Sequence, residues 1–357
     1  MNRKSGHIRA GLRRRVRADA SADPHACSGH STRRKFLLIA IGLCTFTAPL
    51  GSFAQQQGKV YRIGYLSPRA GIESQEEAFR LGLRELGYLE GRNIVIEWRF
   101  AKGKADLLPK FAAELVHLKV DCIVTAGTNS TLAAKQATNA ISIVMANSDD
   151  DPVRHGLVVS LARPGGNVTG FINIGSELAG KRLELLKDTL PKVSRVAILW
   201  DPDSQGGAGH VRETEVTARA LGVQLQSLEL RDAEGLENAF RMAGKARAEA
   251  LIVVGAGLVN VHQARIVNLA AQTRLPAMYT GAVWMLTGGL MSYAAETGEQ
   301  YRGAATYVDR ILKGAKPADL PVVQPTKFVL IINLKTAKQI GLTIPPSVLA
   351  RADRVIE

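Results

Sequence analysis

The side chains with the clearest capacity to bind a small molecule lie in polar loops that directly follow short apolar runs. Three such loops occur in the first half of the chain, at residues 67–71, 127–130 and 147–152. Asp149 or Asp151 can accept a hydrogen bond from a ligand amine or hydroxyl. The backbone N–H groups at the start of a following helix can hold a ligand carboxylate. These loops therefore favour non-covalent binding of a polar solute.

The same residue types also cap helices, so a structural role competes with ligand binding in each loop. Asp151 stands directly before Pro152, a pairing typical of an N-cap and the first helical position. Thr128 and Asn129 are equally suitable caps. Both roles stay open for these residues, but Gly127 lets a ligand approach the backbone closely, which favours binding in that loop.

Residue patterns that could carry catalysis are sparse. The sequence contains no Gly-x-Ser-x-Gly, no His-Glu-x-x-His, no Cys-x-x-Cys and no P-loop. Residues 255–257 read Gly-Ala-Gly after an apolar run, but Asn260 stands where a dinucleotide-binding loop has its third glycine. The four histidines beyond residue 54 show no metal-ligand spacing: His117, His155, His210 and His262. We therefore predict no enzymatic activity, no cofactor and no metal.

The first 54 residues have the composition of an export signal. Arg33 and Arg34 precede the apolar run 36–48, which is shorter than the roughly 20 residues that a membrane-spanning helix needs. Small residues follow at 52–54, as a signal peptidase requires. The paired arginines fit a twin-arginine signal, and an ordinary secretory signal is the alternative. We predict cleavage after Ala54 and a mature protein in the periplasm.

The leader accounts for much of the positive charge. It holds 10 of the 46 Lys and Arg and 2 of the 32 acidic residues, so 36 basic and 30 acidic residues leave the mature chain at +6. The mature part has no basic cluster interleaved with aromatic residues, which argues against nucleic acid as a partner. Of three cysteines, only Cys122 follows the leader, within an apolar run typical of a buried thiol.

Beyond the leader, short apolar runs alternate with stretches of helical spacing. Expected strands lie at 60–66, 94–100, 122–126 and 141–146, and, after a turn-rich loop, at 196–200, 223–230, 251–254 and 277–279. Expected helices between the later strands lie at 183–190, 211–221, 236–246 and 259–271. This alternation predicts an α/β fold of two lobes, each with a parallel sheet covered by helices. The carboxyl ends of the strands are then expected to line a cleft.

Five motifs follow one another along the chain in a specific order: residues 79–88 with 91–93, 161–170 (Leu-Ala-Arg-Pro-Gly-Gly-Asn-Val-Thr-Gly), 181–187 (Lys-Arg-Leu-Glu-Leu-Leu-Lys), 312–321, and 333–337 with 341–346. Together they resemble the ABC-transporter substrate-binding family that includes tryptophan and tyrosine binders. The resemblance implies a periplasmic-binding-protein type I fold, in which two Rossmann-like lobes are joined by three crossovers. The implied crossovers lie near Thr169, at 281–287 and at 320–324. The implied lobes are 59–168 with 288–320, and 170–282 with 324–357.

The resemblance also implies a ligand site between the lobes. Residues 127–130 read Gly-Thr-Asn-Ser where the family has Gly-Thr-Pro-Ala, and 149–152 read Asp-Asp-Asp-Pro where it has Gly-Asp-Pro. Gly-Ala-Gly at 255–257 replaces larger polar residues, so no amine-binding acid carries over there. Ordinary packing is the alternative for Tyr293. The predicted ligand-binding residues are Ser67, Thr128, Asn129, Asp149, Asp151, Gly255, Tyr279, Thr280 and Tyr293.

These inferences predict a monomeric periplasmic receptor for a small organic ligand, such as an amino acid or a related carboxylate. The receptor would pass this ligand to the membrane permease of an ABC importer. Ligand contacts from both lobes are complete only when the cleft is closed, so binding shifts the open and closed populations. The alternatives are a periplasmic enzyme or a sensory receptor on the same two-lobed frame.

Overall fold

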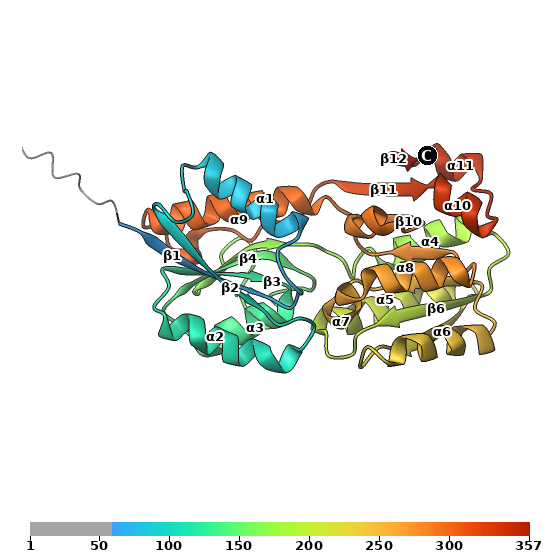
Figure 1. Cartoon of the computed structure of the whole chain (residues 1–357), viewed down its shortest axis with the longest axis horizontal. Helices are drawn as coiled ribbons and strands as arrows, with labels where there is room; N and C mark the ends of the chain where they lie inside the picture. Colours follow the sequence, from blue (N-terminus) through green and yellow to red (C-terminus); the bar gives the residue numbers. More distant parts are fainter. Residues whose placement is uncertain (1–58) are drawn as a thin grey trace, which may run out of the picture. The chain divides into compact units, whose positions relative to one another are not determined.

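The computed structural model describes residues 59–357, which belong to one compact unit (Figure 1). The expected export signal and its cleavage site after Ala54 lie outside the described residues. No helix within 59–357 is long and apolar enough to cross a membrane.

The first lobe is built on a sheet of five parallel strands in the order β2-β1-β3-β4-β5. The strands are β1 (Tyr61–Ser67), β2 (Ile94–Phe100), β3 (Cys122–Ala126), β4 (Ser142–Ser148) and β5 (Val168–Ile172). The helices of this lobe are α1 (Ser74–Glu85), α2 (Leu108–His117, preceded by the 3-10 turn η1, Ala105–Leu107), α3 (Thr128–Ala137) and α9 (Thr297–Leu312).

Both faces of this sheet are covered by helices, which explains why β3 is buried at every position rather than at alternate ones. Tyr65 of β1 packs with α1 and α9 on one face, whereas the next residue, Leu66, packs with α2 and α3 on the other. α1 and α9 lie side by side although they are far apart in the sequence. A Cβ atom on Gly82 of α1 would lie 2.9 Å from the Cβ of Ala305 in α9, so glycine permits this close approach.

The second lobe carries seven strands in the order β12-β11-β10-β9-β8-β6-β7, all parallel except the β10–β11 pair. They are β6 (Arg195–Trp200), β7 (Gln224–Glu229), β8 (Ala250–Val253), β9 (Ala277–Tyr279), β10 (Met291–Ala295), β11 (Phe328–Asn333) and β12 (Arg354–Ile356). The helices are α4 (Ala179–Thr189), α5 (Gln205–Ala220), α6 (Gly235–Lys245), α7 (Gly257–Val261), α8 (Gln263–Gln272), α10 (Leu334–Ile340) and α11 (Pro346–Leu349), with the 3-10 turn η2 (Ala282–Thr287). A further 3-10 turn, η3 (Pro317–Asp319), packs against β4 and β5 of the first lobe.

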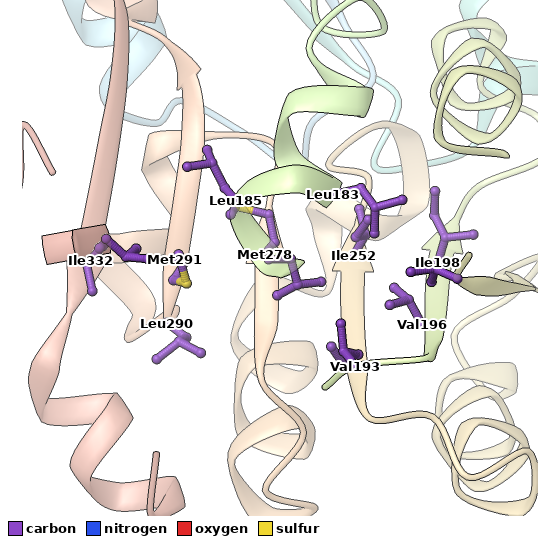
Figure 2. Close-up of a cluster of buried hydrophobic side chains, with 14 of the residues drawn as sticks. Leu183, Leu185, Val193, Val196, Ile198, Ile252, Met278, Leu290, Met291 and Ile332 are labelled. Atoms are coloured by element: carbon purple, nitrogen blue, oxygen red, sulfur yellow. The ribbon is translucent and has the colours of Figure 1, made fainter. Parts of the chain in front are cut away.

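The second sheet is also covered on both faces. α4 and α5 pack on one face, where Leu183 and Leu185 lie over Ile252 and Met278, as Figure 2 shows. α6 and α8 pack on the other face. The two-lobed, mainly parallel α/β architecture expected from the sequence is therefore confirmed, with the antiparallel β10–β11 pair as the exception.

Two of the implied crossovers are displaced in the structure. The ladder of β5 continues to Ile172, so the first crossing follows that residue and not Thr169. Residues 282–287 form η2, and the chain then adds β10 to the second sheet, so the second crossing lies at Glu296. Residues 288–295 thus belong to the second lobe and not the first. Val323 still pairs with Phe171, and the third crossing follows it.

Two helices also differ from their predicted ranges. The expected helix at 259–271 is divided into α7 and α8 at His262. α5 begins at Gln205, earlier than expected, although its first turns contain Gly206, Gly207 and Gly209. Glycine disfavours helix by about 1 kcal/mol relative to alanine, so tertiary contacts must stabilise this segment. Those contacts lie at the cleft described next.

Candidate ligand-binding cleft

A cavity of about 80 Å³ lies between the lobes, at the carboxyl ends of strands from both sheets. Its first-lobe wall is formed by Pro68, Arg69, Gln75, Ala126, Gly127, Asn147, Asp149 and Tyr301, with Asn173 and Gly175 from the segment that leaves β5. Its second-lobe wall is formed by His210, Gly255, Ala256, Gly257, Asn260 and residues 280–284. The cavity therefore has a polar first-lobe side and a second-lobe side that includes an indole.

Asp149 is the carboxylate of this cavity. Its Oδ1 accepts a hydrogen bond of 3.0 Å from Nδ2 of Asn173, which also donates to Oδ1 of Asn147 at 2.8 Å. Its Oδ2 lies 3.6 Å from the place where a Cβ on Gly127 would stand. Burial raises the pKa of Asp149 to about 6, although the bond from Asn173 and the charge of Arg69 favour the ionised form. The group is therefore ionised at neutral pH but held at an energetic cost.

Arg69 is paired within its own lobe. Its Nη1 lies 2.7 Å from Oε2 of Glu73, and its Nε lies 3.6 Å from Oε1 of Glu76. Glu76 is fully buried and accepts a hydrogen bond of 3.1 Å from the Tyr65 hydroxyl. Because two carboxylates already compensate Arg69, it does not form an ion pair with Asp149. Within residues 59–357, Asp149 has no ion-pair partner.

The second-lobe wall is shaped by Trp284. Its ring is 1% exposed and stacks on Tyr279, with centroids 4.9 Å apart and planes 19° apart. A Cβ on Gly255 would lie 2.7 Å from the indole Nε1. Gly255 donates its N–H to Oγ1 of Thr280 at 2.8 Å, and its carbonyl accepts from Nδ2 of Asn260 at 2.9 Å. The glycine therefore leaves room for the indole to form this wall.

The cleft is closed by direct contacts between the lobes. Nδ2 of Asn129 donates to the carbonyl of Asp203 at 2.6 Å, and the N–H of Gln205 donates to Oδ1 of Asn129 at 3.1 Å. A Cβ on Gly206 would lie 2.8 Å from the Cβ of Asp149. The glycine-rich start of α5 thus fits against the loop after β4, which explains its helical conformation despite its composition.

The predicted residues divide into four groups by position. Asp149, Gly255 and Thr280 line the cavity. Three lie immediately behind it: Ser67 accepts from the Arg69 N–H at 3.2 Å, Thr128 accepts from the Asp149 N–H at 3.2 Å, and Tyr279 supports Trp284. Asn129 joins the two lobes. Asp151 and Tyr293 lie outside the cavity.

Asp151 and Tyr293 require correction as members of the cavity wall. Asp151 is exposed, and its Oδ1 accepts a hydrogen bond of 2.9 Å from the N–H of Val153 within a turn. No helix begins at Pro152, so the expected helix cap is also wrong. Tyr293 is in the middle of β10, not at a carboxyl end, and its ring packs near Phe328 with centroids 6.2 Å apart. Neither residue therefore lines the cavity, because Asp151 lies in an exposed turn and Tyr293 lies within a strand.

Several residues of the cavity were not predicted. Asn173 follows β5, a strand that the apolar pattern did not indicate. His210 is one of the histidines without ligand spacing, and it contacts Arg182 of the motif at 181–187, 28 residues earlier. Burial lowers the pKa of His210 well below its usual value, and the charge of Arg182 adds to the shift. Spacing alone cannot reveal such a pair, because it forms between two helices.

Comparison with known proteins identifies a family and relatives of the chain. Residues 69–356 match the model of the family described as ABC transporter substrate binding protein. The tyrosine-binding protein of Clostridioides difficile (strain R20291) is 25% identical over 281 residues, covering 78% of this chain and 80% of the relative.

Two solved structures are similar to the chain throughout their length. The ABC domain in complex with L-Trp from Streptococcus pneumonia has a TM-score of 0.75 and 25% identity, covering 83% of this chain and 99% of that one. A conserved domain protein from Vibrio cholerae has a TM-score of 0.76 and 25% identity, covering 83% and 100%.

Replacement of Asp149 by asparagine tests the energetic cost of its burial. Because the folded-state pKa is raised, the wild type loses stability as pH rises from about 4 to about 6, up to about 3 kcal/mol for a shift of this size. The asparagine of Asp149→Asn does not ionise, so this variant does not lose stability in that pH range. Its side-chain carbonyl oxygen can still accept the hydrogen bond from Asn173. We expect the melting temperature of ligand-free Asp149→Asn to rise relative to wild type between pH 4 and pH 7. The exposed Asp151→Asn is the matched control, and equal behaviour of the two variants would contradict the burial argument.

Proposed function

The chain belongs to the ABC transporter substrate-binding protein family, and from this premise we propose that it captures a free amino acid in the cleft between its lobes. The family consists of solute-binding proteins that bind small molecules and work with the permease of an ABC transporter. The observation that carries the proposal is Asp149, a carboxylate of the cavity wall without an ion-pair partner among residues 59–357. A ligand ammonium group supplies that partner.

The surroundings of Asp149 suit recognition of an ammonium group. Asn173 occupies Oδ1, and Gly127 has no side chain that would cover Oδ2. A hydrogen bond between charged groups is roughly twice as strong as a neutral one. The burial that makes the unpaired carboxylate costly also strengthens its attraction for a cation. Relatives described as binding tyrosine and L-Trp support an amino acid as the ligand class.

The volume of the cavity limits the size of the ligand side chain. Its volume of about 80 Å³ is roughly half of the 150 Å³ of an engineered cavity that takes up benzene. A small amino acid fits the closed cleft as it stands. A tyrosine or tryptophan ligand requires Trp284 to move or the lobes to close less far. Binding to the individual amino acids decides between these possibilities.

Closure of the lobes provides the mechanism of capture. Asp149 is on the first lobe, whereas Gly255, Thr280 and Trp284 are on the second. A ligand that contacts both walls favours the closed population by its differential affinity for that state. No bond of the ligand needs to be made or broken, so we propose a monomeric receptor without enzymatic activity or cofactor, and without nucleic acid as a partner.

Export to the periplasm is part of the proposal. The sequence pattern at 33–54, with two arginines, a short apolar run and a small-residue site, supports it. The permease of an ABC importer is the proposed partner that receives the solute.

The ligand can be identified by native mass spectrometry of freshly purified protein, followed by calorimetry with each of the twenty protein amino acids. We expect one amino acid per chain, bound without chemical change during prolonged incubation. Asp149→Asn should weaken this binding about 10- to 100-fold, because a hydrogen bond to a charged group contributes about 1.5–3 kcal/mol. Repeated turnover to a new product would show an active site instead, and failure of all twenty amino acids to bind would reject the ligand class.

Substitution of Gly206 tests whether closure is required. Gly206→Ala places a methyl group against Asp149, and an overpacked contact costs about 1–3 kcal/mol. We expect affinity for the identified amino acid to fall about 5- to 150-fold, while melting of the ligand-free protein is unchanged or higher because alanine favours helix. X-ray scattering at saturating ligand should show incomplete compaction. The matched control is Gly244→Ala, in an exposed turn of α6 with open space, which should bind as wild type does.

The export route can be tested on the leader alone. N-terminal sequencing of exported protein should give Gln55 as the first residue. Replacement of Arg33 and Arg34 by lysine should abolish export if the twin-arginine route is used. Unchanged export of the double variant would assign the general secretory route, and exported protein that retains residues 1–54 would disprove the cleavage.

A further inference from the structure

Arg182 is a buried cation behind the cavity. The residue is 1% exposed and belongs to α4. Its Nε donates to the carbonyl of Tyr293 at 2.7 Å, and its Nη1 donates to the carbonyl of Gly175 at 2.7 Å. No carboxylate within residues 59–357 forms an ion pair with it. Burial lowers its pKa to about 9, so the group keeps its charge at neutral pH. A buried charge without a counterion is costly, which calls for a functional reason.

The contact between Arg182 and His210 fixes the state of the imidazole. Nη1 of Arg182 lies 3.4 Å from Nδ1 of His210. A guanidinium has only donors, so Nδ1 must be the acceptor and must carry no proton. The proton of the neutral imidazole is then on Nε2. A second proton would place two cations in contact, in agreement with the lowered pKa of His210.

The Nε2–H group is directed to the cavity. His210 and Gly175 both line it, and Nε2 lies 3.1 Å from the position of a Cβ on Gly175. No acceptor among residues 59–357 takes this N–H. The nearby carboxylate of Asp150 is bonded to Nε2 of His155 at 3.0 Å. Asn173 links Asp149 to the segment beside His210. Its amide nitrogen donates to Asp149, and its amide oxygen accepts from the Gly175 N–H at 2.9 Å.

We propose that His210 Nε2–H donates a hydrogen bond to the carboxylate of the bound amino acid, with Arg182 as the positioning residue that fixes the tautomer. The unpaired charge of Arg182 makes the cavity wall at His210 attractive to an anion, whereas the carboxylate of Asp149 is attractive to a cation. The ammonium and carboxylate groups of the ligand are thus bound by residues of different lobes. The inference rests on the proposed function, because it assigns the second half of the same ligand.

The first test measures the tautomer directly in the wild-type protein without any added ligand. Protein unfolded and refolded to remove bound solute is labelled with ¹⁵N, and long-range correlations of the His210 ring are recorded. We expect Nδ1 to resonate as an unprotonated nitrogen and Nε2 as a protonated one across neutral pH. The reverse assignment, or an imidazolium, would overturn the proposal.

The second test measures recognition of the carboxylate. The probes are the twenty protein amino acids, and, for those that bind, the α-carboxamides, which lack the negative charge. Wild type should prefer the acid to its amide by about 10-fold or more. His210→Phe should weaken binding of the acid about 10- to 100-fold and remove most of this preference. His210→Gln, whose amide can donate, should retain part of it, and the exposed His117→Phe should behave as wild type.

The outcomes separate this inference from the proposed function. If no amino acid binds wild type, the ligand class is wrong and the inference falls with it. If an amino acid binds and His210→Phe keeps the same preference for acid over amide, only the role of His210 is rejected. Melting temperatures of both His210 variants without ligand show whether a loss of affinity reflects unfolding. If His210→Phe is unfolded, the preference for acid over amide is compared between wild type and folded His210→Gln.

Discussion

Two charges of opposite sign at one cavity, the partly buried Asp149 and the buried Arg182, each lack an ion-pair partner in residues 59–357, and this is the constraint on which the architecture around the cavity depends. Asp149 begins the loop after β4 in the first lobe, and Arg182 contacts His210 of the second-lobe wall. A charge removed from water is unfavourable without a compensating group. The proposed amino-acid ligand is a zwitterion that compensates both charges, and on this proposal the two unpaired charges favour such a ligand over a solute with only one charge.

The residues around Asp149 serve to keep it in place and accessible. Thr128 holds its backbone and Asn173 holds one carboxylate oxygen. Gly127 and Gly206 have no side chains that would crowd Asp149. Arg69, the nearest candidate for a partner, is compensated by Glu73 and Glu76 instead. A strong internal ion pair at Asp149 would stabilise the protein, but it would also satisfy the carboxylate that the ligand is expected to meet.

Closure depends on contacts that do not touch the ligand. Asn129 bonds to Asp203 and Gln205 across the cleft, and the glycines of α5 allow the helix start to reach the β4 loop. These contacts form only when the lobes meet, so they contribute to the closed state whatever solute is bound. We therefore expect affinity to depend partly on residues outside the cavity, and selectivity to depend on the proposed ligand contacts at Asp149, His210 and Trp284.

The sequence by itself determined eight of the twelve strands among residues 59–357, the family, and three loops that meet at the cavity. Apolar runs and helical spacing located eight strands because burial on both faces of a parallel sheet leaves a local pattern. The rule that ligands bind beyond the carboxyl ends of strands located Asp149, Gly255 and Thr280. Only the tertiary structure decided that Asp151 lies in a turn outside the cavity, that Asn129 joins the lobes, and that β10 stays in the second sheet. Strand pairing, lobe closure and the Arg182–His210 contact join residues distant in sequence, and such contacts leave no local periodicity from which they could be inferred.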